Sequence, residues 1–126
     1  VGDDITIIAT GYMVWEAIQA GLILRDQGIH ADVINMHTIK PLDSKAIVES
    51  ASRTGLVVTA EEHQRWGGLG GSVAQVLAEH HPTQMSMVAV DDRFGESGTP
   101  KQLMEKYGLT ADVIVARSLE LIAQKK

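Results

Sequence analysis

The sequence has no cysteine, no excess of basic residues and no long apolar run, and each absence excludes a class of protein. Without cysteine the chain has no disulfide, no catalytic thiolate and no cysteine-based zinc site. Eleven lysine and arginine residues against sixteen acidic residues give a net charge of −5, which argues against a nucleic-acid partner. No segment approaches the roughly 18 apolar residues of a membrane span, and residues 1–4 do not resemble a signal peptide. Cytoplasm is therefore the expected location, with no membrane partner.

The residues that are present predict one ordinary folded domain. The 126 residues are 44% hydrophobic and 21% charged, which is typical of a soluble domain with a single core. No repeat, low-complexity tract or linker interrupts the chain, so we expect residues 1–126 to form a single domain. The first residue is Val1 instead of methionine, which favours a fragment or the end of a longer subunit.

Short β-branched apolar runs alternate with helical patterns along the whole chain. The strands are expected at residues 4–9, 31–36, 55–60 and 85–90. The helices are expected at residues 13–27, 43–53, 72–81, 99–108 and 111–123. Gly28 and Pro82 are predicted to end two of the helices, and Asp43 is predicted to cap another. This order predicts parallel pairing through right-handed crossovers, hence a three-layer α/β/α fold with a mainly parallel sheet.

Ligands of such folds bind beyond the carboxyl ends of the strands, where this chain delivers four polar groups. These are residues 10–12, His37, residues 61–63 and residues 91–93. Glu61, Glu62 and His63 form the densest polar cluster, which fits either an acid–base pair or a solvated surface that contacts a neighbouring domain.

The polar residues at these strand ends give only weak support for a metal site or for a catalytic triad. His37, Glu62, His63 and Asp91 would have to converge from separate loops, and none is spaced like a known pair of metal ligands. No nucleophile, base and orienting residue stand in a recognisable arrangement. We therefore predict no catalytic and no metal-binding residue.

The glycine-rich segment at residues 67–72 leads into a helix, whose backbone amides are able to bind a phosphate. It does not match a dinucleotide fingerprint, because Val73 stands where a third glycine is needed. Tight turning and close approach of the helix to the sheet explain these glycines better. Trp66, on the same loop, is expected to pack against a partner or, equally, against its own domain. Trp15 lies one turn into the first helix.

Four motifs carry a family resemblance over nearly the whole chain. In order they are ITIIATG at residues 5–11, INMHTIKPLD at 34–43, TAEEHQRWGGLGGS at 59–72 and FGESGTPKQLMEKYGLT at 94–110. Together they resemble the C-terminal domain of transketolase-type thiamine diphosphate enzymes. The last motif is most similar to transketolase itself, particularly the form split into two subunits. Deoxyxylulose-phosphate synthase and the β subunits of 2-oxoacid dehydrogenases are the alternatives.

The resemblance implies an enzyme whose chemistry lies in other domains. Its members transfer a two-carbon ketol unit from a ketose phosphate to an aldose phosphate. They bind thiamine diphosphate and a divalent metal, usually magnesium, between pyrophosphate-binding and pyrimidine-binding domains of a homodimer. The cofactor-binding motif and the activating glutamate belong to those domains, so no catalytic or cofactor-binding residue is carried over to this chain.

By the same resemblance, this domain supports its neighbours and contributes to dimerisation, and the isolated fragment is expected to be inactive. The expected interdomain or dimer contacts are Glu61, Glu62, His63, Trp66, Gly67, Gly68 and Gly70. The resemblance also implies the strand order 2-1-3-4. One more antiparallel strand is expected before Val1, and without it the second strand is an exposed edge.

A free-standing α/β ligand-binding or regulatory module is the alternative of another class. A receiver-type module needs acidic residues after its first strand, whereas Asp3 and Asp4 precede it. A flavodoxin-like module needs a loop rich in hydroxyls after that strand, and residues 10–13 are poor in them.

Overall fold

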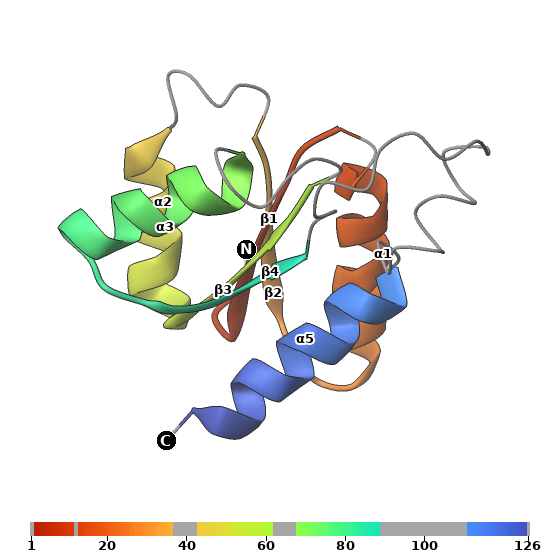
Figure 1. The fold of residues 1–126 in the computed structure, drawn as a ribbon. Helices are drawn as coiled ribbons and strands as arrows, with labels where there is room; N and C mark the ends of the chain where they lie inside the picture. Colours follow the sequence, from red (N-terminus) through yellow and green to blue (C-terminus); the bar gives the residue numbers. More distant parts are fainter. Residues whose placement is uncertain (1, 12, 37–42, 62–67, 89–110, 126) are drawn as a thin grey trace.

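A computed structural model of the protein describes residues 2–11, 13–36, 43–61, 68–88 and 111–125. Within these residues, strands and helices alternate, and Figure 1 shows the helices on both sides of one sheet. The elements are β1 (Ile5–Ala9), α1 (Met13–Asp26), β2 (Ala31–Asn35), α2 (Ser44–Thr54), β3 (Leu56–Ala60), α3 (Leu69–His80), β4 (Gln84–Val88) and α5 (Ala111–Gln124).

The four strands form one parallel sheet in the order β2-β1-β3-β4. In its register, Ile8 of β1 lies opposite Ile34 of β2 on one side and Thr59 of β3 on the other. Every residue of β1 and β3 is buried, as expected for parallel strands that are covered on both faces. The predicted fold class and strand order are confirmed.

Two hydrophobic cores lie on opposite faces of the sheet. Ile7 packs with Leu24 of α1 and Ile114 of α5 on one face. Ile8 packs with Ile47 of α2 and with residues of α3 on the other face. Because adjacent residues of a strand point to opposite faces, each of these two isoleucines belongs to a different core. Figure 1 shows the same division, with α1 and α5 on one side of the sheet and α2 and α3 on the other.

Two glycines in the left-handed conformation end helices. Gly28, with φ of 80°, follows α1 as predicted. Gly55, with φ of 76°, donates its N–H to Ala51 O at 2.8 Å and thereby caps α2. Gly55 was expected to be the first residue of the third strand, and this is wrong by one residue because the glycine instead ends the helix. Asp43 caps the same helix at its start, as predicted, by accepting the N–H of Ala46 at 3.1 Å.

The other boundaries agree within three residues. The largest difference is the start of α3, which begins at Leu69 and not at Ser72. The expected helix at 99–108 and the end of the expected fourth strand, residues 89–90, lie outside the described residues. In the described part of the chain, no helix combines the length and the apolar character that crossing a membrane requires.

Candidate functional site

The carboxyl ends of the strands meet at one edge of the sheet, as the order of elements predicts. The backbone continues the pairing there, since Met36 N donates to Ala9 O at 2.9 Å and Glu61 N donates to Val88 O at 3.0 Å. Of the polar residues expected at this edge, Thr10, Gly11 and Glu61 are described. The others lie outside the described residues: Tyr12, His37, Glu62, His63 and residues 91–93.

Glu61 is buried directly after β3, with 2% of its surface exposed. Its Oε1 accepts the N–H of Leu69 at 2.8 Å, and its Oε2 accepts the N–H of Gly70 at 2.6 Å. Both oxygens thus accept from the first amides of α3, at the positive end of the helix dipole, where a carboxyl group stabilises a helix. Glu61 therefore caps the N-terminus of α3 from the position that directly follows β3.

This cap explains why the helix begins earlier than predicted. Gly68 holds the N-cap position in extended backbone and has no side chain that would accept a hydrogen bond. The first amides of a helix need an outside acceptor, and a cap is ordinarily found within a few residues of the helix start. Here the acceptor is Glu61, eight residues before Leu69, so the local pattern around the glycines gave no sign of it.

The same contacts bear on whether a phosphate binds here. The amides of Leu69 and Gly70 point at Glu61, and so they are not available to an anion. The first turn of α5 likewise donates an N–H, that of Ala111, to Glu16 Oε1 at 3.0 Å. Among the described residues, no group of three or more His, Asp or Glu side chains is placed to hold a metal ion. The amides of Leu69, Gly70 and Ala111 are therefore already paired and do not form a diphosphate site.

Gly70 confirms the structural interpretation of the glycine-rich segment. A Cβ at this position would lie 2.9 Å from Met87 Sδ and 3.1 Å from Thr59 Oγ1, so α3 approaches β3 and β4 more closely than a larger residue allows. The Thr59 hydroxyl beneath this contact is fully buried and, within the described structure, has no hydrogen-bond partner.

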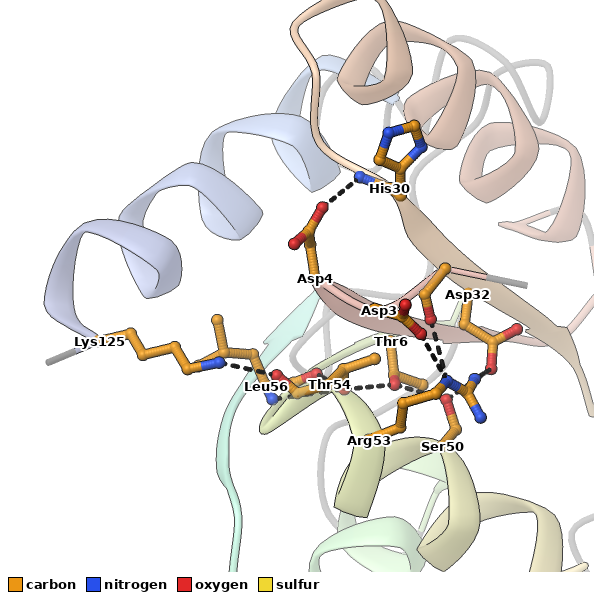
Figure 2. Close-up of polar contacts among 11 residues, drawn as sticks. Asp3, Asp4, Thr6, His30, Asp32, Ser50, Arg53, Thr54, Leu56 and Lys125 are labelled. Carbon is orange, nitrogen blue, oxygen red and sulfur yellow. Dashed lines mark hydrogen bonds and ion pairs between the residues drawn. The ribbon is translucent and has the colours of Figure 1, made fainter.

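A second polar group lies at the opposite edge, near the amino ends of the strands (Figure 2). Ser50 donates to Asp32 Oδ2 at 2.6 Å, and the Thr6 hydroxyl lies 2.6 Å from Ser50 and 2.8 Å from Thr54. Arg53 pairs with Asp32 as well. These groups satisfy one another, and each joins α2 to the sheet. The cluster is therefore a structural link between layers.

The ends of the chain are attached to this cluster. Arg53 also donates to Gly2 O at 3.2 Å and forms an ion pair with Asp3 at 3.2 Å, which holds the backbone entering β1. At the other end, Lys125 donates to Thr54 O at 3.0 Å. This position suits a cation, because the C-terminus of α2 is the negative end of the helix dipole. Figure 2 shows Arg53 between Asp3 and Asp32, and Lys125 reaching toward Thr54 from the end of α5.

One exposed surface, on α1, was not predicted from the sequence. Trp15, Ile18 and Leu22 are 65%, 42% and 48% exposed on α1, and they lie on one face of that helix because they are spaced i, i+3 and i+7. The buried face of α1 is the opposite one, formed by Met13, Ala17, Ala20 and Leu24. Both sets were visible in the sequence, but a helix with apolar residues on two faces does not itself show which face the sheet covers.

Comparisons with known proteins agree on one family. The profile described as "Transketolase, C-terminal domain" matches residues 1–114. A 6-deoxy-6-sulfo-D-fructose transketolase subunit of Clostridium sp. strain MSTE9 is 48% identical over 124 residues, which is 98% of this chain and 38% of that protein. The 1-deoxy-D-xylulose-5-phosphate synthase of Desulforudis audaxviator is 44% identical over 116 residues, which is 90% of this chain and 18% of that protein.

Solved structures give the same result. A structure titled "Split gene transketolase, inactive beta4 tetramer" superposes with a TM-score of 0.93 at 48% identity. The match covers 100% of this chain and 41% of that one. The chain thus spans well under half the length of these relatives.

Proposed function

Since the chain belongs to the transketolase C-terminal domain family, we propose that it is the C-terminal part of a longer thiamine diphosphate-dependent subunit. This enzyme transfers a two-carbon ketol unit between sugar phosphates, with chemistry that the cofactor supplies as a stabilised carbanion. The observation that carries the proposal is the match to a transketolase subunit over 98% of this chain but only 38% of that protein.

The domain's own role is assembly. Three of its four described helices, α2, α3 and α5, have a carboxylate at the start, from Asp43, Glu61 and Glu16 respectively, and we assign the cofactor to the pyrophosphate-binding and pyrimidine-binding domains. A carboxylate at a helix start repels a diphosphate and stabilises the helix, so these contacts favour a supporting role over a binding one. The proposed partners are those two domains, in the same or a complementary subunit, within a homodimeric enzyme in the cytoplasm.

The test is ketol transfer by the natural full-length subunit, mixed with the complementary subunit that carries the pyrophosphate-binding domain. A ketose phosphate labelled with ¹³C in its two-carbon unit is supplied with an aldose phosphate acceptor, thiamine diphosphate and magnesium. The proposal expects the label in a new ketose phosphate by mass spectrometry, and no transfer when the cofactor is omitted. Label that stays in the donor under all conditions would contradict it.

A second candidate is a synthase of 1-deoxy-D-xylulose 5-phosphate, because a protein of that name is 44% identical to this chain. A parallel assay of the same preparation, supplied with pyruvate and glyceraldehyde 3-phosphate, separates the two, because a 1-deoxy sugar needs a donor that loses carbon dioxide and leaves an acetyl unit instead of a ketol unit. Formation of 1-deoxy-D-xylulose 5-phosphate without transfer of the labelled unit would favour the synthase.

A further inference from the structure

The outer face of α1, formed by Trp15, Ile18 and Leu22, has the character of a contact surface. These are the large hydrophobic side chains that remain exposed in the described structure. Beside them, an open hollow of about 320 Å³ lies between α1 and β2, lined by Ile18 and Leu22 on one side and Ala31 and Val33 on the other, with Arg25 and His30 also in its lining. An apolar stripe that continues into a hollow is typical of a surface that another polypeptide covers.

The hollow also reaches the backbone that leads into β1. Gly2 is part of its lining and is packed so closely against the backbone of His30 that a Cβ has no room there. Arg53 holds the same stretch in place from the other side. Any polypeptide joined to the amino side of Gly2 therefore leaves from the rim of the hollow, next to the exposed face of α1.

We propose that, in the full-length subunit, polypeptide that precedes this domain packs on the outer face of α1 and into the hollow beside it. The inference rests on the proposed function, in which this chain is the C-terminal part of a longer subunit. The transketolase subunit that it resembles has most of its length outside the matched region. This places a docking surface on α1, on a different part of the domain from the contacts expected within residues 61–70.

The size of the surface favours a tethered occupant over a separate molecule. A stable interface between separate proteins takes about 20–30 residues on each side, whereas this stripe is three side chains and a hollow. A segment joined to the domain does not pay the full entropy of association, and its effective concentration is high, so a small apolar contact is enough.

The test is hydroxyl-radical footprinting of the natural full-length subunit, read residue by residue by mass spectrometry. The oxidation rate of Trp15 is compared with its rate in the urea-unfolded subunit, and exposed His80 on α3 serves as the internal reference. We expect Trp15 to be protected several-fold more than His80, at every protein concentration and without any other subunit. Protection that grows with concentration would assign the face to a second copy, and protection that needs the complementary subunit would assign it to that subunit. Either result, or an unprotected Trp15, would overturn the inference.

A variant gives an independent readout. Leu22→Lys in the full-length subunit should raise the rate of proteolytic cleavage just before Gly2 by about tenfold, the ratio that corresponds to 1.4 kcal/mol of lost docking. Ala116→Lys, at an exposed position of α5, is the matched control and should leave the rate unchanged. Equal rates would contradict the proposal. Neither assay depends on enzyme activity, so the two proposals fail separately. A subunit with a protected Trp15 but no ketol transfer would overturn only the proposed function. An active subunit with an exposed Trp15 would overturn only this inference.

Discussion

Replacing Glu61 by glutamine removes one of two adjacent backbone contacts while keeping the size of the side chain. In the native protein the carboxylate accepts from Leu69 N at 2.8 Å and from Gly70 N at 2.6 Å. Glutamine has one carbonyl oxygen and one amide group, so one of the two backbone N–H groups will face another donor. With 2% of Glu61 exposed, water has little access to replace the lost acceptor.

The expected loss of stability follows from these contacts. A hydrogen bond to a charged group contributes about 1.5–3 kcal/mol, and a carboxylate at a helix start adds about 0.3–2 kcal/mol. Relief of the desolvation of a buried charge offsets part of this sum. We expect Glu61→Gln to lower the free energy of unfolding by about 2–3 kcal/mol, equivalent to roughly 10 °C in melting temperature for a domain of this size.

The assay is urea and thermal unfolding of the 126-residue chain, followed by circular dichroism. Glu79→Gln makes the same substitution at an exposed position of α3 and should change stability by less than about 0.5 kcal/mol. If the two variants unfold at the same urea concentration, the carboxylate does not hold the start of α3 and the reasoning is refuted.

Two further predictions concern hydroxyls and backbone. Thr6→Val should destabilise the chain by about 1–2 kcal/mol, because the Thr6 hydroxyl contacts Ser50 and Thr54. Thr59→Val should leave stability unchanged or raise it by about 1 kcal/mol, because the buried Thr59 hydroxyl has no hydrogen-bond partner in the described structure. Urea unfolding of both variants checks the pair, and equal effects would show that the Thr6 contacts contribute nothing. Gly55→Ala should cost about 1–2 kcal/mol because φ is 76° there, and Gly55→Asn should cost less. Alanine tolerated as well as glycine in the same assay would contradict the left-handed cap.

The fold could be predicted because its signals are local. The runs at β1 and β3 are apolar on both faces, which identifies buried parallel strands, and Asp43 and Gly28 mark helix ends within one turn of the helix they bound. The strand order came from the family resemblance, since alternation of strands and helices alone leaves several orders open.

Two features of the structure, the start of α3 and the exposed face of α1, could not be predicted from the sequence for physical reasons. The start of α3 depends on Glu61, which directly follows β3, and no pattern around Gly70 reveals a cap from so far along the chain. The outward face of α1 depends on which side of the helix the sheet covers, and Trp15 on one face and Leu24 on the other are both apolar. Of the predicted docking residues, Glu62, His63, Trp66 and Gly67 lie outside the described residues, and Glu61 and Gly70 are buried within the domain. The docking role of this set, Gly68 included, stays a prediction.

We propose that this domain supports a thiamine diphosphate enzyme without binding the cofactor itself. Calorimetric titration of the folded 126-residue chain with thiamine diphosphate and magnesium tests it most directly, with the assembled full-length enzyme as the positive control. We expect saturable heat for the assembled enzyme and none for the chain alone. Saturable binding to the chain alone with micromolar affinity would contradict it.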